Sequence, residues 1–523
     1  MPADVDALDP ITAMTPEVVA AALGDEGVRW LVDLQRRSDA AAARAAAAEA
    51  RVEAAEVRAK QLEGELSAAQ ARIAELEKEN RQLQARLGKD SSNSSRPPSS
   101  DGPQAMPKRK LKAQKGKRSG HPAGGQPGHK GKTRRLRPVE EADQVFHHHP
   151  DHCERCDEAL DEAPEAGEPL PHQQYELPPL KLWLFHHWLH RKSCPRCMTV
   201  TTAKLPPCAA TGQGPRLTAF IGLLTGHYQL SRSKVRGLVQ DLFDVEIATG
   251  TVQACWDRVG EALRLPVEEL VGALRKVTSA FLDETGWKQW GKRCWLWVAT
   301  TAMFAVFMIH PRRGSDVLHQ WFPEGFGGIV HSDRWVAYSF FDIEKRQLCW
   351  SHLGRDLQGI IDGKGAGADQ AEVMRRGEAW MFGAWHEHKS GRMSRADLQA
   401  TTAYFRKAYR EYCETGAAQK GDDDWRKLGT GMIKLWPAVF RFLDVEGIQP
   451  TNNFAEQEVR KGVLWRRSSQ GTRSETGSVC VSRMLSIDAS CRKQDVDVLE
   501  YLTAALIASW SGIPPPSPLP SQK

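Results

Sequence analysis

Apolar residues recur every three and four positions between Val52 and Leu87, which is the spacing of a helix that buries one narrow stripe. In heptad notation these are the a positions Val52, Ala59, Leu66, Ile73, Asn80 and Leu87 and the d positions Ala55, Leu62, Ala69, Leu76 and Leu83. Only Asn80 is polar, and a buried Asn at an a position sets the register of a parallel pair. We predict a leucine-zipper-like coiled coil over residues 36–88 that joins a homodimer, preceded by a helical lead-in over 1–35. The alternative is a solvated monomeric helix, which needs no such repeat.

The pattern changes after Gly88, where Ser, Asn and Pro predict a flexible basic linker over residues 89–138. Between Met106 and Arg137 the chain has twelve Lys or Arg and no Asp or Glu. Such a block attracts nucleic-acid phosphates without reading the base sequence. We expect DNA contacts from its first basic residues, Lys108, Arg109, Lys110 and Lys112. A solvated linker is the alternative.

Residues 139–205 contain two Cys-x-x-Cys pairs, Cys153 with Cys156 and Cys194 with Cys197. Each pair can direct two thiolates at one ion, and two pairs complete the four-sulfur shell that favours structural Zn²⁺. We predict a small zinc-binding unit that depends on the ion because it is too small for a core of its own. The alternative is four reduced cysteines paired by chance.

Residues 206–275 resemble short helices separated by Gly, Ser and Thr. The segments LSRSKVRGLVQDL (230–242) and TGTVQACWDRV (249–259) each have a Ser or Thr near the start that is suited to a helix N-cap. We predict a helical, helix-turn-helix-like DNA-binding region with Thr251, Gln253 and Arg258 on its second helix as candidates for reading bases. A plain helical scaffold is the alternative.

Strand-like sequence follows over residues 276–345, including an uncharged run from Cys294 to Ile309. We interpret this run as buried strands because it is too short to span a membrane. Residues 346–445 are expected to form a helical insertion, 446–480 the second part of the same core, and 481–510 a C-terminal helical segment. The Pro-rich tail, 511–523, is expected to be disordered. The predicted fold class is therefore multidomain α+β.

Three acidic residues stand out by their surroundings. Asp283 ends the strand-like run VTSAFLDETGW, and Asp333 ends GGIVHSDRW. Glu456 lies in TNNFAEQEVRKGVLWRR, where Asn452 or Asn453 can cap a helix. Two strand-end Asp and one helix Glu can converge on two Mg²⁺ (or Mn²⁺) ions that act on a phosphodiester. We expect the basic residues after the Glu to hold the DNA backbone, namely Arg460, Lys461, Arg466 and Arg467.

Several of these segments resemble the insertion-sequence-66 family of transposases. TNNFAEQEVRKGVLWRRSSQGTRSETGS is similar to its final-Glu signature, and LDETGW and HSDRWVAY to its two Asp segments. CWSHLGRDL (349–357) resembles its Cys-x-x-His-x-x-Arg stretch, and the linker and Cys pairs also match. The sequence departs from the family at Arg334 and Trp335, where Gly and Tyr are usual, and after Glu456, where Glu458 becomes a competing carboxylate. Because Glu458 points to a different helix face, we assign the role to Glu456.

The resemblance implies a ribonuclease-H-like α/β catalytic domain of the DDE type, split by a helical insertion. It implies a transposase of a bacterial insertion sequence that binds terminal inverted repeats and target DNA, with Asp283, Asp333 and Glu456 as catalytic residues. His352 and Arg355, three positions apart on one helix face, are then expected to contact a phosphate near the metals. Accessory proteins from the same element are possible partners.

Charge and composition place few further limits. The net charge is +6, the first residues lack a secretory pattern, and the eleven cysteines are scattered. We therefore expect a cytoplasmic, nucleoid-associated protein without a membrane partner. Three other functions stay open: a non-catalytic zinc-containing DNA-binding regulator derived from a transposase, a ribonuclease-H-like nuclease without joining activity, and a coiled-coil scaffold.

Overall fold

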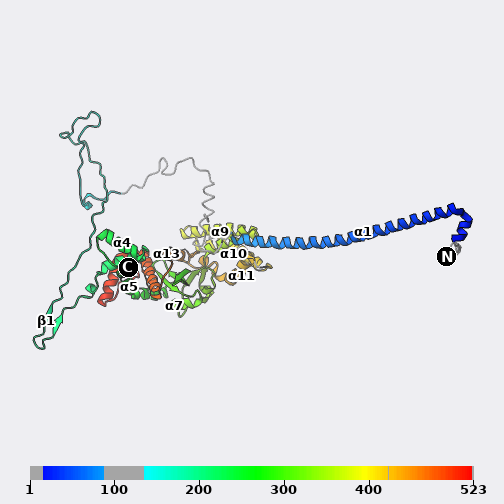
Figure 1. Ribbon diagram of the computed structural model, residues 1–523. Helices are drawn as coiled ribbons and strands as arrows, with labels where there is room; N and C mark the ends of the chain where they lie inside the picture. The colour runs from blue at the N-terminus through cyan, green and yellow to red at the C-terminus, as the bar shows by residue number, and fades with distance from the viewer. Residues whose placement is uncertain (1–15, 88–92, 94–134, 422, 521–523) are drawn as a thin grey trace. The chain divides into compact units, whose positions relative to one another are not determined.

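The computed structural model describes residues 16–87, 93, 135–421 and 423–520, and the chain divides into two units, 1–88 and 89–523. The first unit is helix α1 (Pro16–Leu87), the long blue helix of Figure 1. It kinks at Gly24, whose φ of 64° and ψ of 172° are not helical. The heptad side chains Leu66 and Ile73 are 60% and 56% exposed. This exposed apolar stripe therefore packs against nothing within the described residues of the first unit. The expected linker residues Lys108, Arg109, Lys110 and Lys112 lie outside the described residues.

The second unit contains a five-stranded mixed sheet in the order β5-β4-β3-β6-β7. Strands β3 (Ser279–Gln289), β4 (Lys292–Thr300) and β5 (Ala305–His310) form an antiparallel meander. Strands β6 (Ile329–Ser332) and β7 (Arg346–Leu348) continue the sheet in parallel to β3. The prediction of buried strands in the apolar run 294–309 is confirmed by β4 and β5. The structure is thus mixed α+β, as predicted.

The edge strand β5 is protected by a ladder of serines on helix α14 (Glu475–Lys493). Ser482, Ser486 and Ser490 lie four residues apart and therefore on one helix face. Their hydroxyls accept hydrogen bonds from the N–H groups of Ile309, Phe307 and Ala305 at 3.1, 2.8 and 3.2 Å. The helix thereby pairs backbone donors that an open sheet edge would leave free. Since α14 crosses residue 480, the predicted boundary between core and C-terminal segment does not coincide with a break in the structure.

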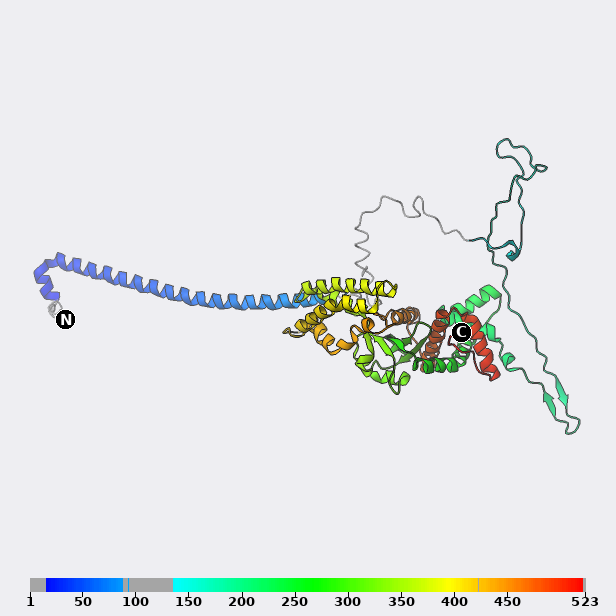
Figure 2. The ribbon, with the colours of Figure 1, turned by 180° about the vertical axis from the view of Figure 1, so that it is seen from behind.

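Between β7 and helix α13 (Asn453–Ser469) the chain forms a separate helical group. It comprises α8 (Trp350–Gly363), α9 (Ala368–Lys389), α10 (Arg395–Ala417), α11 (Asp424–Lys434) and α12 (Arg441–Asp444). Figure 2 shows α9, α10 and α11 gathered beside the sheet. These helices bury a second hydrophobic core rich in aromatic rings, including Trp350, Phe405, Tyr409 and Phe440. Because β7 belongs to the sheet, the insertion begins after Leu348 rather than at 346.

The region before β3 is helical: α3 (Pro215–Gly226), α4 (Arg232–Phe243), α5 (Thr249–Ala262) and α6 (Arg264–Leu274). Ser231 caps α4 by accepting the N–H of Lys234, whereas α5 has no side-chain cap. Helix α5 packs against α3, α4, α14 and the last helix, α15 (Val498–Ser511). Thr251, Gln253 and Arg258 are consequently half-buried. Base reading by these three residues stays a prediction.

The Pro-rich tail was expected to be disordered, and over residues 511–520 this is wrong. Tyr501 donates a hydrogen bond to the carbonyl of Pro516 at 2.8 Å, and Gln494 donates to that of Pro518 at 2.9 Å. Leu519 packs against the main hydrophobic core. Proline has no N–H to satisfy, so an extended Pro-rich segment can pack through its rings and carbonyls alone. Within the described residues, every helix is too short or too polar to cross a lipid bilayer.

Candidate functional site

Asp283 and Asp333 lie side by side because of the register of two parallel strands. The last paired residues of β3 and β6 are Phe281 and His331, whose rings stack at 4.0 Å. Each Asp follows two residues later, so both carboxylates extend from the same face of the sheet. Phe454 of α13 packs on Phe281 with ring centroids 4.9 Å apart, which places the start of α13 on that face. The third predicted carboxylate, Glu456, lies in that first turn.

The expectation that Asp283 ends a strand is wrong, although Asp333 does directly follow β6. Asp283 is in the middle of β3, where it pairs with Val298 of β4. On its other side the pairing with β6 has already stopped. The Asp283 carboxylate accepts the N–H of Glu284 at 2.9 Å. Strand β3 therefore stops pairing with β6 before Asp283 but continues to pair with β4 beyond it. The sequence alone cannot distinguish such a strand from one that ends at Asp283.

Asn452 connects the start of α13 to the sheet instead of capping the helix. It occupies the N-cap position, but its side-chain N–H₂ donates to the carbonyl of Leu282 at 2.7 Å. Its backbone N–H donates to the Sγ of Cys349 at 3.1 Å. Asn452 is 1% exposed, so both bonds lie in the interior. The predicted capping role of Asn452 is therefore wrong, and its side chain instead fixes Glu456 relative to Asp283.

The three carboxylates interact electrostatically. Burial raises the pKa of Asp283 well above its ordinary value, and the negative charges of Glu284, Asp333 and Glu456 raise it further. Burial also raises the pKa of Asp333, opposed by the N–H of Trp335, which donates to its carboxylate at 2.8 Å, and by Arg313. A group of repelling, partly buried carboxylates is stabilised by a hard divalent cation, whose preferred ligands are oxygens. The oxygen donors suit Mg²⁺ or Mn²⁺. Among the described residues, however, the ligand atoms of Asp283, Asp333 and Glu456 do not all lie within 4.8 Å of one another, so a shared ion would have to draw them closer.

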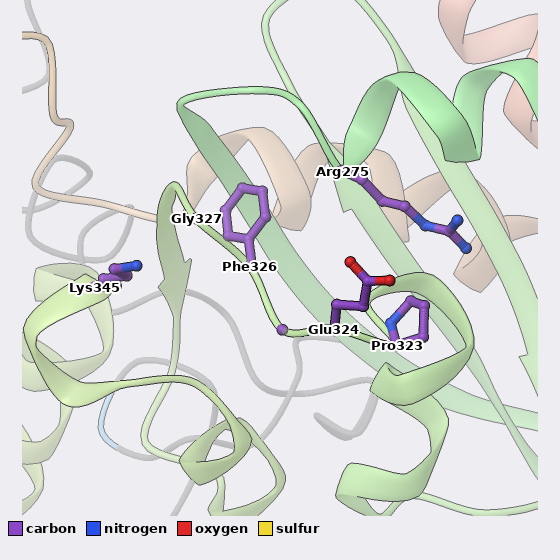
Figure 3. A pocket seen from close by; sticks show the side chains of 7 residues that line it. Arg275, Pro323, Glu324, Phe326, Gly327 and Lys345 are labelled. Atoms are coloured by element: carbon purple, nitrogen blue, oxygen red, sulfur yellow. The ribbon is translucent and has the colours of Figure 1, made fainter.

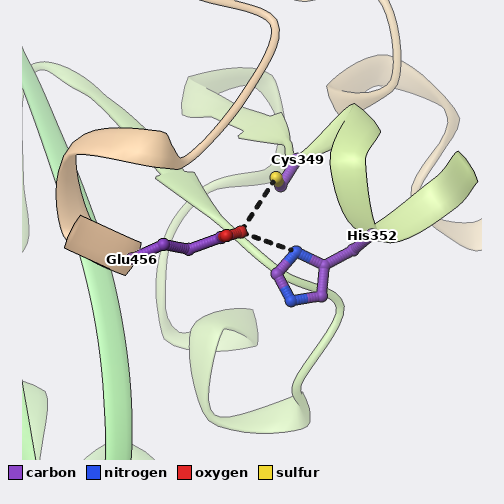
Figure 4. A group of neighbouring side chains, drawn as sticks. All are labelled: Cys349, His352 and Glu456. Atoms are coloured by element: carbon purple, nitrogen blue, oxygen red, sulfur yellow. Dashed lines mark hydrogen bonds and ion pairs between the residues drawn. The ribbon is translucent and has the colours of Figure 1, made fainter. Parts of the chain in front are cut away.

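Glu456 is also held from the side of α8, as Figure 4 shows. Its Oε1 lies 3.4 Å from Nδ1 of His352, 3.5 Å from Nη2 of Arg355 and 3.7 Å from Sγ of Cys349. Burial lowers the pKa of His352 to about 3 and raises that of Cys349 to about 12, so both are neutral at physiological pH. Of the predicted DNA residues, Arg355 thus pairs with Glu456 in this structure, whereas the buried Nδ1 of the neutral His352 lies near Glu456 without a hydrogen bond among the described residues. The ligand atoms of Cys349, His352 and Glu456 all lie within 4.8 Å of one another.

Sequence reasoning missed a buried network behind the two aspartates. Glu284 accepts hydrogen bonds from Tyr338 and, at 2.9 Å, from Arg313. Burial and the charge of Asp333 raise the pKa of Glu284 to about 7. The Arg313 guanidinium also stacks on Trp335 at 3.8 Å. The adjacent acidic residues Asp283 and Glu284 in LDETGW were the sequence signal that could have indicated this network. Only the fold shows that the two side chains have different partners.

Glu458, the competing carboxylate, lies elsewhere. It is 6% exposed and forms ion pairs with Lys461 at 2.8 Å and with Lys493 at 3.4 Å. Lys461, which was predicted to bind DNA, therefore forms an ion pair with Glu458 in this structure. Arg466, also predicted to bind DNA, donates to Thr285 at 3.1 Å and to the carbonyl of Gly286. Arg460 and Arg467 are exposed on the same helix.

The two Cys-x-x-Cys segments fold into matching turns. The N–H of Cys153 donates to the carbonyl of Glu158 and that of Cys194 to Thr199, both at 2.9 Å. The residue after each second cysteine, Asp157 or Met198, has a positive φ of 60° or 58°. Strands β1 (Arg191–Ser193) and β2 (Val200–Thr202) flank the second turn.

The structure does not bring the four sulfurs together. Among the described residues, no three of the sulfurs of Cys153, Cys156, Cys194 and Cys197 lie within 4.8 Å of one another. The segment between them has exposed apolar side chains, such as Trp183 at 82%, and no core of its own. Because the protein alone supplies little apolar burial here, an ion would be needed to draw the turns together. The zinc site stays a prediction.

A mixed sheet with two adjoining aspartates and a helix glutamate defines a carboxylate-centred site on an α+β domain. The family model of the transposase IS66 family matches residues 212–479, which include all three carboxylates. The chain therefore belongs to the transposase IS66 family. Residues 38–135 match a family of unknown function, DUF6444.

Two curated relatives come from Sinorhizobium fredii (strain NBRC 101917 / NGR234). The uncharacterized protein y4jO is 26% identical over 183 residues, which are 35% of this chain and 54% of that protein. The uncharacterized protein y4qI is 22% identical over 298 residues, which are 52% of this chain and 55% of that protein. The chain thus spans about half the length of the curated relatives it matches.

Proposed function

We propose that this transposase cuts and rejoins DNA at the site formed by Asp283, Asp333 and Glu456. The observation that carries the proposal is geometric: the register of β3 and β6 places Asp283 beside Asp333, and the Asn452–Leu282 hydrogen bond holds the first turn of α13, with Glu456, against β3. Burial and the neighbouring carboxylates Glu284, Asp333 and Glu456 all oppose the ionisation of Asp283 when no cation is bound. Such an arrangement is typical of a metal-binding catalytic site rather than of a structural core. We also propose that the sheet is the ribonuclease-H-like core of a DDE enzyme.

The chain's own residues would position the reacting groups. Asp283, Asp333 and Glu456 would hold two Mg²⁺ ions, which activate the attacking oxygen and stabilise the leaving oxygen of a phosphodiester when bound. Asn452 fixes the distance between the helix and the strand, and Arg355 fixes the direction of the Glu456 carboxylate. Arg460 and Arg467 would contact the DNA backbone, since both are exposed on the helix that carries Glu456. The substrates would be terminal inverted repeats, followed by target DNA.

The proposal is tested by strand transfer on DNA that carries the element's terminal inverted repeats. We expect the purified chain with Mg²⁺ to release a 3′-hydroxyl and to join that end to a target plasmid. Accessory proteins from the same element would be added in a second arm. Cleavage without joining in both arms would favour a nuclease. Binding without cleavage in both arms would favour a non-catalytic regulator.

We further propose that α1 dimerises as a coiled coil. Its apolar heptad side chains are exposed, and a helix of 72 residues gains most of its stability from packing. Changing both Leu66→Lys and Ile73→Lys should convert a dimer into a monomer, as measured by sedimentation equilibrium. The control is Ala71→Lys, which lies at the outward f position and should leave the dimer intact. A monomeric parent protein would contradict the proposal.

We also propose that Cys153, Cys156, Cys194 and Cys197 bind one structural Zn²⁺. The matching turns at the two pairs support this assignment. The purified protein should contain about one zinc per chain by elemental analysis, and Cys194→Ser should reduce it to near zero. Cys208→Ser, which changes an exposed cysteine outside both pairs, is the matched control. Removal of the ion should leave residues 139–205 sensitive to protease. Unchanged zinc content in Cys194→Ser would reject the assignment.

A further inference from the structure

A cavity of about 690 Å³ lies where α4, α5, the end of α13 and the start of α14 meet. We call it the Arg232 pocket, and its basic side chains are Arg232, Lys234 and Arg473. Among its described lining residues there is no Asp or Glu, whereas six carry a hydroxyl group. A cavity of this size is within the range of about 300–1,000 Å³ found for small-molecule sites. Its lining indicates an anionic ligand.

Two helices direct their N-terminal ends toward the pocket. Helix α4 has 12 residues and begins after Ser231, and α14 has 19 residues and begins after Ser474. Each cap serine accepts one N–H, from Lys234 at 3.3 Å and from Gly477 at 3.0 Å. The other first-turn N–H groups and the positive end of each helix dipole favour a phosphate. Both helix ends therefore reinforce the charge of the basic side chains.

A buried hydroxyl provides an independent indication of a ligand. Thr225 is 1% exposed and lines the pocket, and its Oγ1 has no hydrogen-bond partner among the described residues. Buried polar groups are nearly always paired, so this hydroxyl needs a partner from outside the chain. Beside it lie Trp256 and Trp465, with ring centroids 6.0 Å apart. The pocket thus combines phosphate-binding groups with an apolar floor that suits a base.

We propose that the Arg232 pocket binds an unpaired nucleotide of the DNA on which the protein acts. The phosphate would lie near Arg232, Lys234 and Arg473, and the base would lie against the tryptophan floor. This inference rests on the proposed function. Glu456 and Ser468, a lining residue, are twelve positions apart on α13, which is about 18 Å of helix. The pocket would therefore hold the DNA about five duplex steps from the cut.

The other prominent hollow lacks these properties. It has a volume of about 420 Å³ and is lined by Arg275, Glu324 and Lys345 among others, as Figure 3 shows. The Arg275 guanidinium already donates to the carbonyl of Trp321 at 2.7 Å. This bond to a neutral carbonyl resembles that of Arg232 to Gln253, but here the carboxylate of Glu324 would repel a phosphate. We assign no nucleotide to it.

The test is binding to labelled DNA, measured by fluorescence anisotropy without added divalent cations. The probes are a blunt duplex and the same duplex with a three-nucleotide single-stranded overhang. We expect the parent protein to bind the overhang probe about fivefold or more tightly than the blunt one, because stacking adds to phosphate contact. The double variant Lys234→Gln and Arg473→Gln should lose that preference. Both residues are exposed, so the variant is expected to fold.

The matched control removes two exposed charges outside the pocket, Arg236→Gln on α4 and Arg376→Gln on α9. This control should keep the preference for the overhang. Equal binding of the two probes by the parent protein, or an equal loss in the control, would overturn the proposal. Binding of free adenosine monophosphate without a preference for the overhang would also overturn the assignment to DNA. Because the assay needs no catalysis, its outcome is independent of whether the three carboxylates cut DNA.

Discussion

Replacing Asp283 with Asn is expected to abolish strand transfer and, at the same time, to make the metal-free protein more stable. Activity should fall by about a thousandfold or more, because the variant loses a carboxylate of the catalytic group. Stability should rise by about 0.5–2 kcal/mol at pH 8, because Asn removes a charge that burial disfavours and that Glu284, Asp333 and Glu456 repel. The gain is expected as a rise of a few degrees in Tm.

The pH dependence gives this prediction a second readout. The pKa of Asp283 is raised in the folded protein, so the carboxyl group is neutral when folded at low pH and resembles Asn. The stabilising effect of Asp283→Asn should therefore be small near pH 4 and grow as the pH rises, since the charged form opposes folding. Adding Mg²⁺ at pH 8 should raise the Tm of the parent protein more than that of the variant. A variant that is less stable than the parent at pH 8 without metal would contradict the account.

Glu456→Gln and Glu458→Gln should have opposite effects, although the two residues are only two positions apart. Glu456→Gln should lower strand transfer by about a thousandfold. Its Tm should change little, because the Glu456 side chain is 32% exposed and the lost ion pair with Arg355 is offset by the lost repulsion of Asp283. Glu458→Gln should keep most of the activity per folded molecule. It should cost about 1–3 kcal/mol of stability, because Lys493 is only 13% exposed and would lose its carboxylate partner.

The measurements for this pair are a strand-transfer assay and thermal unfolding on the same preparations. The comparison is internally controlled, because both variants remove one carboxylate from the same helix. Loss of activity in Glu458→Gln at a temperature where it is fully folded would move the third carboxylate to Glu458. A large fall in Tm for Glu456→Gln would instead indicate a structural role for Glu456.

Elements with a strong local pattern could be predicted from the sequence. The heptad repeat predicted the C-terminal end of helix α1 to within one residue, since α1 ends at Leu87. The apolar run 294–309 predicted the strands β4 and β5. The three carboxylates could be predicted from the strand-like and helical segments that contain them, together with the family resemblance. Their proximity depends on the register of β3 and β6, which brings together residues fifty positions apart. The order of the strands could not be read from any single segment.

Other features depend on tertiary contacts and could not be predicted from the local sequence. Arg346 lies in the buried strand β7, where it donates to Ser332 at 3.2 Å, although a charged residue predicts an exposed position. Helix α5 matches the sequence pattern of a recognition helix, yet it packs against α3, α4, α14 and α15. The proline-rich tail packs because its carbonyls meet Tyr501 and Gln494. In each case a distant partner decides the environment, and local sequence does not specify that partner.

If Asp283, Asp333 and Glu456 share divalent cations, a bound Mn²⁺ ion should lie among their carboxylates. Crystals grown with Mn²⁺ and measured for its anomalous scattering would locate the ion. We expect a peak within coordination distance of the two aspartates, with Glu456 as a further ligand, and its loss in Asp283→Asn. A peak at Cys349, His352 and Glu456 alone, or no peak at the aspartates when the ion is saturating, would show that the three carboxylates do not form the metal site.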